Sequence, residues 1–251
     1  MVVSGLGGAT PPVPADARPA LFFTTHELPE IRARSESTAW LRALRTSLLA
    51  TADRFLATPT DPYSLTSSEN GIGTAGRALQ QRIGVLAFAG YLTEDRRYFD
   101  QAKAIMLAAA RQTEPTNRTH WVTHLQYSDA AQAFAIGYDW LQPFLSEDER
   151  TEIRAEIAQF GDLLFTDETV WGTSDPGVSS SNHNSVHFGA LGLCALALGD
   201  RPEWLAHATE RVRAYFRHFI DETGYATEGH QYLAYGLLGA LPFAHALERS
   251  G

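Results

Sequence analysis

Residues 184–198 read NSVHFGALGLCALAL, and this stretch decides the fold class. Its apolar residues fall on every side of a helix, so a helix formed here must be buried all round. The residues just before it, Ser179-Ser180-Ser181-Asn182-His183, are polar. Burying polar groups without partners costs free energy, so a polar cluster that opens a buried helix indicates that its donors meet something.

Segments that are apolar on every side of a helix recur along the chain with a period of about fifty residues, as in helical repeats. Helices that are apolar all round are expected to start near residues 77, 129, 184 and 231, and one-sided amphipathic helices near 95, 147 and 203. Fully apolar helices must lie inside, whereas striped ones lie outside. The sequence therefore predicts an all-α fold, an incomplete α/α toroid or α-solenoid built from antiparallel pairs of inner and outer helices.

Local signals place some of the boundaries. Thr24-x-x-Glu27 and Ser146-x-x-Glu149 have the form of capping boxes, which mark helix starts. Residues 1–20 begin with a Gly/Pro-rich stretch, so we expect them to form a flexible N-terminal segment. Residues 21–251 are expected to form one helical domain.

Composition excludes several classes of protein. A chain of 251 residues with 44% hydrophobic and 20% charged residues is typical of a globular protein with a sizeable core. Its net charge of −9 and its single lysine, Lys103, argue against nucleic acid as a partner. No apolar run approaches the ~20 residues of a membrane span, and residues 1–14 have neither the basic start nor the apolar stretch expected of a signal peptide. Cys194, the only cysteine, is predicted to be a buried structural thiol.

In an up-and-down layout, every inner helix begins at the same end of the molecule. The loops before these helices concentrate polar and aromatic side chains, whereas the opposite loops look like ordinary turns. We therefore predict one site at that end. Its candidate substrate-binding residues are His120, His124, Gln126, Tyr127, Trp171, Glu228 and His230, and the same loops carry Asn182, His183, Tyr232 and Tyr235.

Each of these residues also has a structural interpretation. Asn182 could simply cap the helix that follows, and both tyrosines could be core aromatic residues. His120 and His124 have the i, i+4 spacing of a metal pair, but no Glu-x-x-His signature accompanies them. We therefore predict no metal site and no cofactor in this chain.

Four segments, in this order, carry a family resemblance. They are Arg18-Pro19-Ala20-Leu21-Phe22-Phe23-Thr24; Ser128-Asp129-Ala130-Ala131 with Tyr138-Asp139-Trp140-Leu141; Asn182-His183 with Ala195-Leu196-Ala197-Leu198-Gly199-Asp200; and Gly224-Tyr225-x-x-Glu228-Gly229-x-x-Tyr232-x-x-Tyr235. Together they resemble the heparinase II/III-like family of polysaccharide lyases, which includes heparinase-type and alginate-lyase-type enzymes.

The resemblance implies an α/α toroid followed by β-sandwich domains, with the catalytic cleft between them. This chain would then be the toroid portion of a longer parent, and the β-sandwich partner would lie outside it. It also implies a uronate-containing oligo- or polysaccharide as the substrate and no membrane partner. Members of the family are often periplasmic or secreted.

The implied reaction is β-elimination. The C5 proton of a uronate is too weakly acidic to be removed unless the neighbouring carboxylate is neutralised, so hydrogen-bond donors must meet the developing enediolate. By the resemblance, Asn182 and His183 supply them, and Tyr232 or Tyr235 acts as general base and acid. Both tyrosines lie on one face of a helix; Tyr232 is slightly favoured because it is closer to the helix start.

Two alternatives stay open. A glycoside hydrolase on a related toroid would need paired carboxyl groups, for which Asp129, Asp139 and Glu228 are available. A non-catalytic helical module that binds glycans would need no reacting groups at all.

Overall fold

The structure is a computed structural model, and it describes residues 18–57, 72–111, 125–166, 182–226 and 229–250. Helices make up almost all of this part of the chain, and its only β feature is an isolated bridge between Ile220 and Ala226. The all-α prediction is confirmed for these residues. The helices are η2 (Thr25–Glu27), α1 (Leu28–Ser35), α2 (Ala39–Ala57), α3 (Ile72–Thr93), α4 (Arg96–Ala110), α5 (Leu125–Leu141), η4 (Gln142–Phe144), α6 (Glu147–Thr166), α7 (Asn182–Leu198), α8 (Pro202–Phe219) and α9 (His230–Arg249).

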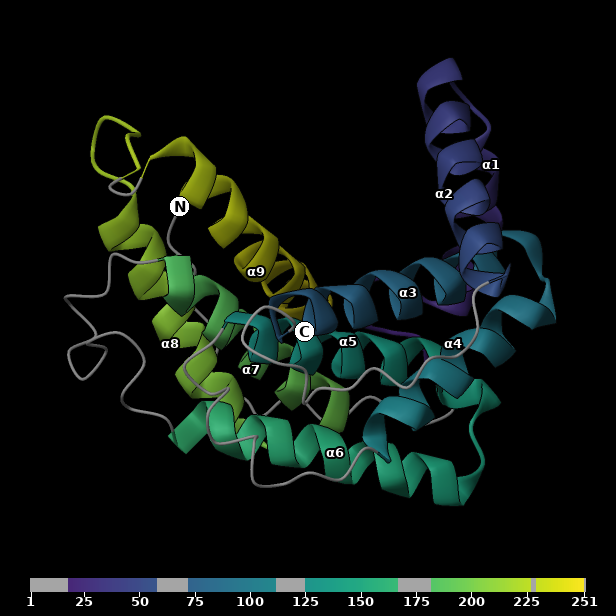
Figure 1. Ribbon diagram of the computed structural model, residues 1–251. Coiled ribbons are helices and arrows are strands. Elements are labelled where there is room, and N and C mark those ends of the chain that lie inside the picture. Colours follow the sequence, from purple (N-terminus) through teal and green to yellow (C-terminus); the bar gives the residue numbers. More distant parts are fainter. Residues whose placement is uncertain (1–17, 58–71, 112–124, 167–181, 227–228, 251) are drawn as a thin grey trace.

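Two rows of helices alternate along the described chain, and they are called inner and outer below. Helices α3, α5, α7 and α9 lie side by side in chain order, while α4, α6 and α8 pack along them as a second row (Figure 1). Each outer helix packs against the inner helix that precedes it. The described part of the chain therefore consists of repeated helix pairs.

Neighbouring inner helices run in the same direction. Between α3 and α5, Arg77 pairs with Asp129 and, one turn further on, Gln80 pairs with Gln132. Between α7 and α9, Gly189 lies against Gly239, and Gly192 lies against the ring of Phe243. In each pair, the contacting positions advance in the same direction along both helices. Arg18 binds Asp139 near the end of α5 and the Ala197 carbonyl near the end of α7, so the inner helices of both pairs begin at one common end of the molecule.

Capping chemistry fixes several helix starts as the sequence predicted. The Glu149 carboxylate accepts the Ser146 backbone N–H at 2.8 Å, and the Ser146 hydroxyl accepts the Glu149 N–H at 3.2 Å. The Thr24 N–H likewise donates to the Glu27 carboxylate at 2.7 Å, which starts η2. Such reciprocal bonds satisfy N–H groups that have no partner inside the helix.

Helix α7 is buried almost along its whole length, as its composition requires. Cys194, in its second half, is fully buried, and this burial raises the pKa of its thiol to about 12. A thiol with so high a pKa remains protonated and unreactive at neutral pH. The prediction of a buried structural cysteine is confirmed.

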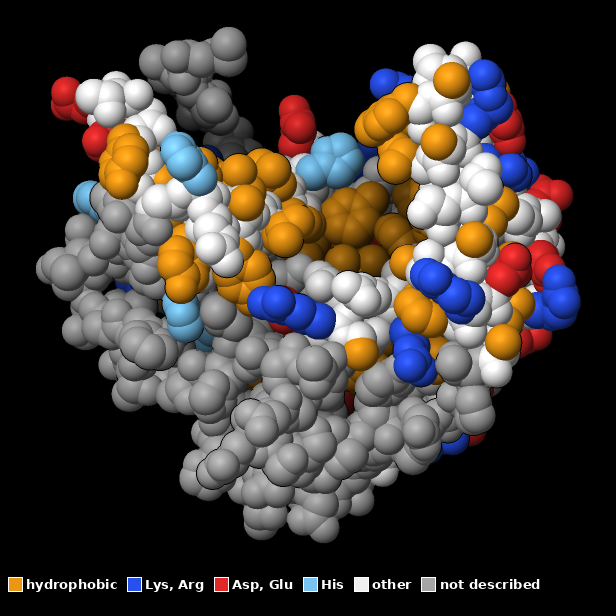
Figure 2. All heavy atoms as spheres, turned by 45° about the horizontal axis from the view of Figure 1, so that its top comes forward, with side chains coloured by type: hydrophobic (Ala, Val, Ile, Leu, Met, Phe, Trp, Pro, Cys, Tyr) orange, Lys and Arg blue, Asp and Glu red, His pale blue; other side chains and the backbone are white. Residues whose placement is uncertain are grey.

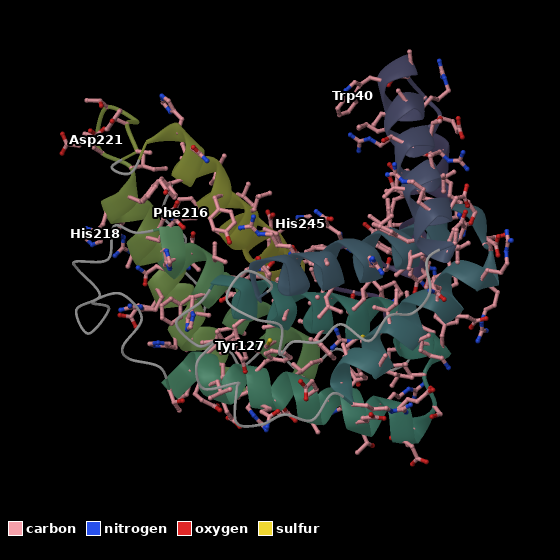
Figure 3. The ribbon with its side chains drawn as sticks, in the orientation of Figure 1. Trp40, Tyr127, Phe216, His218, Asp221 and His245 are labelled. Carbon is pink, nitrogen blue, oxygen red and sulfur yellow. The ribbon has the colours of Figure 1, made fainter. Side chains whose placement is uncertain are left out.

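Helix α9 departs from the prediction that helices apolar all round are buried. Its one extensive packing partner among the described helices is α7, and Leu238 is 69% exposed on another side. Helix α2 also projects from the body, with Trp40 equally exposed near its start (Figures 1 and 3). Figure 2 shows a hollow between α2 and α9 with hydrophobic side chains on its floor.

Residues 18–20 correct the predicted flexible segment. Arg18 is buried and forms an ion pair with Asp139, which is fully buried near the end of α5. The backbone N–H of Ala20 donates to the same carboxylate at 3.0 Å. These bonds hold the chain against the helices from Arg18 onward, and residues 1–17 lie outside the described residues. In the described segments, we find no helix that combines the length and apolarity needed to traverse a bilayer.

Candidate functional site

Arg77, Asp129 and Tyr235 meet near the common end of the inner helices. They come from the second turns of three helices, α3, α5 and α9. The Arg77 Nε atom donates to Asp129 Oδ2 at 3.1 Å, and the guanidinium carbon lies 4.8 Å from the centre of the Tyr235 ring. This is the geometry of a cation–π contact. A cation thus lies between a carboxylate and a tyrosine at the end where the sequence predicted a site.

The surroundings of this cluster change its proton affinities. Burial raises the pKa of Asp129, although Arg77 opposes the increase. Burial and the Asp129 charge also raise the pKa of Tyr235 above its ordinary value of 10, while Arg77 acts in the opposite direction. Tyr235 therefore keeps its proton at neutral pH and can serve as a proton donor.

A second polar pair extends this layer into the molecule. Gln80 Nε2 donates to Gln132 Oε1 at 3.0 Å, one turn beyond the Arg77–Asp129 pair. Gln132 is buried, and this bond satisfies its side-chain oxygen. The polar face shared by α3 and α5 is therefore two turns deep.

Asn182 and His183 occupy the first turn of α7. Asn182 is buried, and its backbone carbonyl accepts the Ser185 hydroxyl at 2.8 Å. His183 is half-buried. A Cβ atom on Gly236 of α9 would lie 2.9 Å from Ser185 Oγ, so the first turn of α7 contacts the second turn of α9. The structure thus brings the predicted Asn-His pair to the same end as Tyr235.

The other predicted residues of α9 and α5 lie in different surroundings. Tyr232 is 51% exposed, and His230 is exposed with its ring 6.4 Å from that of Tyr225. Tyr127 is fully buried, and its ring packs 4.6 Å from that of Phe160 in α6. The position of Tyr127 between α5 and α6 favours a packing role over a substrate contact.

Several predicted substrate-binding residues lie outside the described part of the chain. They are His120, His124, Trp171 and Glu228, together with the side chain of Gln126. Their roles remain predictions. Among the described residues, no three His, Cys, Asp or Glu side chains are grouped as metal ligands.

Sequence reasoning did not single out Arg77. The available signal was its position: residue 77 marks the expected start of the first inner helix, as residue 129 marks the start of the next. Aligning these two starts would have placed a cation opposite a carboxylate on adjacent parallel helices. In the sequence alone, Asp129 stands out only as a possible carboxyl group of a hydrolase.

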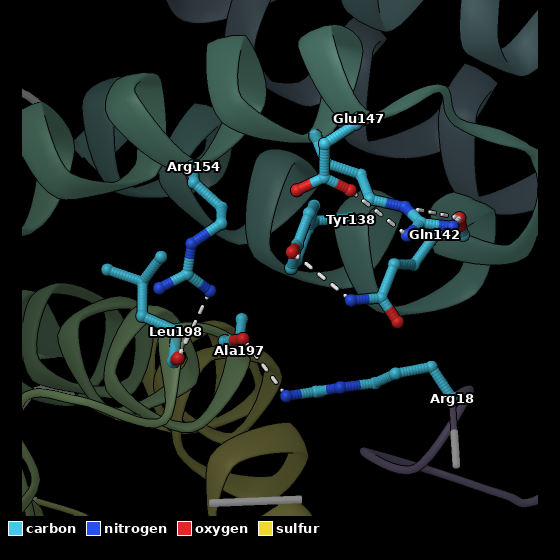
Figure 4. A pocket seen from close by; sticks show the side chains of 8 residues that line it. Arg18, Tyr138, Gln142, Glu147, Arg154, Ala197 and Leu198 are labelled. Carbon is cyan, nitrogen blue, oxygen red and sulfur yellow. Dashed lines mark hydrogen bonds and ion pairs between the residues drawn. The ribbon is translucent and has the colours of Figure 1, made fainter. Parts of the chain in front are cut away.

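A cavity of about 220 Å³ lies at the opposite end of the inner helices (Figure 4). Its lining consists of Arg18, Tyr138, Gln142, Glu147, Arg150, Arg154, Ala197 and Leu198. The arginines bind backbone carbonyls at helix ends: Arg18 bonds Ala197 O at 3.0 Å and Arg154 bonds Leu198 O at 3.2 Å. Such groups satisfy carbonyls that have no partner inside the helix, so this end of the molecule has a structural role.

A scan against protein-family models found no matching family, and a search of curated proteins found no matching relative. The residues at the common end of the inner helices therefore provide the basis for a functional proposal.

Proposed function

We propose that this chain is the helical part of a lyase that cleaves a uronate-containing glycan by β-elimination, and that its helix pairs form part of an α/α toroid. The observation that carries the proposal is the grouping of Arg77, Asp129 and Tyr235 at the end where α7 begins with Asn182 and His183. That grouping supplies a cation, amide and imidazole groups, and a tyrosine proton.

These groups match the demands of the reaction. Removal of the C5 proton places negative charge on the substrate carboxylate, which Asn182 and a nearby cation can stabilise. In place of the tyrosine base that the resemblance implies, we assign removal of the C5 proton to the imidazole of His183, and the electron pair of the C5–H bond forms the C4–C5 double bond. The C4–O4 bond then breaks, and the leaving O4 takes the phenolic proton of Tyr235.

We assign this proton transfer to Tyr235 rather than to Tyr232. Tyr235 is half-buried, its hydroxyl oxygen is wholly buried, and its ring contacts a guanidinium group, whereas Tyr232 is half-exposed on the first turn of α9. An acid shielded from water and held beside a cation is better placed to donate a proton at a defined position. This choice reverses the slight preference for Tyr232 that came from its position nearer the helix start.

The test replaces each tyrosine by phenylalanine in the full-length protein. Product formation is followed through the absorbance of the unsaturated uronate, with alginate, heparan and hyaluronan oligomers as substrates. We expect Tyr235→Phe to lower the rate by about 10²- to 10⁴-fold, the usual contribution of general acid–base catalysis. Tyr232→Phe is the matched control and should retain most of the activity. Full activity in Tyr235→Phe contradicts the assignment, and no product with any oligomer contradicts the lyase proposal.

The hydrolase alternative finds less support. Asp139 is fully buried and accepts bonds from Arg18 and from the backbone N–H groups of Ala20 and Leu21, so it is a structural carboxylate. Asp129 is bound to Arg77. Loss of glycan hydrolysis in Glu228→Gln, with both tyrosine variants fully active, would favour a hydrolase; binding of an oligomer without any product would favour a binding module.

A further inference from the structure

We propose that Arg77 is a positioning residue for Tyr235 and that Asp129 orients the Arg77 side chain. The Arg77 guanidinium group then stabilises the tyrosinate that is left when Tyr235 gives up its proton. The catalytic part of this inference rests on the proposed lyase function. The interaction among the three side chains does not, so the two can be tested separately.

The geometry of Arg77 is set from two sides. Its Nε atom is bound to Asp129, whose side chain is buried between helices and therefore has little freedom to move. Its guanidinium carbon lies over the Tyr235 ring. Because the bond to Asp129 uses Nε, that bond leaves the Nη groups available for other contacts, and the side chain as a whole is 50% exposed. A planar guanidinium held at one edge in this way presents its other donors in a fixed direction.

Charge explains why such a residue is needed. When Tyr235 transfers its proton to O4, the electron pair of its O–H bond remains on the phenolate oxygen. That phenolate would lie near the Asp129 carboxylate, and two like charges in a partly buried site repel each other strongly. Arg77 acts on both groups and leaves the cluster with one net negative charge instead of two. Its presence therefore makes proton transfer from Tyr235 easier.

Few charged groups of the described residues act on the Tyr235 hydroxyl. Among the described residues, the ionised groups that influence it are Arg77 of α3 and Asp129 of α5. Helix α7, which packs against α9, contributes Asn182, His183 and Ser185 in its first turn. The two charged groups should therefore have opposite effects: Arg77 favours the ionised tyrosine, and Asp129 opposes it.

The experiment measures the ionisation of Tyr235 directly, without a glycan. Tyrosine-selective ¹³C labelling and NMR follow the ring signals as pH is raised, and the signal lost in Tyr235→Phe identifies the residue. We expect Arg77→Gln to raise the titration midpoint of Tyr235 by about one pH unit or more, and Asp129→Asn to lower it by a similar amount. Arg77→Lys, which keeps the charge, should remain closer to the wild type.

Arg82→Gln is the matched control. Arg82 lies on the same helix as Arg77, and its guanidinium carbon is 5.5 Å from the ring of Phe55, which cannot ionise. This variant should leave the Tyr235 midpoint unchanged. Circular dichroism verifies that each variant is folded, and Asp129→Asn provides an independent test should Arg77→Gln unfold. A Tyr235 midpoint unmoved in the folded variants overturns the inference.

Kinetics then separate the two proposals. If the full-length protein is a lyase, Arg77→Gln should lower kcat more than it raises KM, because the tyrosinate develops only as the reaction proceeds. A shifted midpoint in a protein that cleaves no oligomer would support the positioning role and reject the lyase function. Normal kcat in Arg77→Gln, with the lyase activity established, rejects the catalytic role of Arg77.

Discussion

At the scale of single residues, Asp139 shows how one carboxylate can fix a chain segment. Arg18 donates to it, the Ala20 N–H reaches both of its oxygens, and the Leu21 N–H donates at 3.0 Å. None of its side chain is exposed to solvent. A buried carboxylate is stable only while hydrogen-bond donors and a counter-ion compensate its charge.

We therefore expect Asp139→Asn to lower the free energy of unfolding by about 3–5 kcal/mol, because it leaves the Arg18 cation buried without its counter-ion. The measurement is equilibrium unfolding in urea. Asp200→Asn is the control, since Asp200 pairs with Arg154 where both side chains are partly exposed. This variant should lower the free energy of unfolding by at most about 1 kcal/mol. Equal losses in the two variants would contradict the structural role of Asp139.

At the scale of helices, the contact between α7 and α9 depends on glycine. A Cβ atom on Gly239 would lie 2.4 Å from the Cα atom of Val186 and 2.9 Å from the Ser185 carbonyl oxygen. These are backbone atoms, so a flexible side chain cannot relieve the clash by moving. The two inner helices can approach this closely only because position 239 carries no side chain.

Replacing Gly239 by alanine should force the two helices apart and lower the free energy of unfolding by about 1–3 kcal/mol, as overpacking of a core does. Gly84→Ala is the matched control on α3, because no atom other than those of its chain neighbours and the nearby backbone of its own helix lies within 4 Å of the position its Cβ would take. Alanine is the better helix former, so this variant should gain up to about 1 kcal/mol. Thermal and urea unfolding test whether the two substitutions change the free energy of unfolding in opposite directions.

Much of the helical pattern could be predicted from the sequence, because burial on all sides and burial on one side leave different periodicities. The starts of α6 and α7 followed from a capping box and from the change between polar and apolar residues. The exposure of Leu238 could not be predicted, since a leucine carries no information about whether a neighbouring helix covers it. The role of Arg77 could not be predicted for a related reason: it depends on contacts with Asp129 and Tyr235, which lie 52 and about 160 positions away in the sequence.

At the scale of the whole molecule, the first and last described elements are in contact. Arg249 at the end of α9 donates to Glu27 through both Nη atoms, across 222 positions of the chain. Nearby, the His245 ring stacks on that of Phe22 with an interplanar angle of 11°. The N-terminal segment therefore lies against the end of α9 as well as the end of α5.

This contact makes a specific contribution to the pH dependence of stability. Arg249 and the Thr24 N–H lower the pKa of Glu27 from 4.5 to about 2 in the folded protein. A lowered folded-state pKa stabilises the protein above the unfolded value, and this stabilisation is lost as pH falls from about 4.5 towards 2. Because both side chains are partly exposed, the contribution should not exceed about 1 kcal/mol.

We expect Glu27→Gln to be less stable than the wild type near neutral pH, and the difference to shrink as the pH is lowered from about 5 to about 3. Glutamine can still accept the Thr24 N–H in a capping box, so the substitution isolates the charge of Glu27. Urea unfolding at a series of pH values measures the difference, with the exposed Glu30→Gln on α1 as the control. A gap between Glu27→Gln and the wild type that stays constant over this range would show that the ion pair with Arg249 does not link the two ends of the described chain energetically.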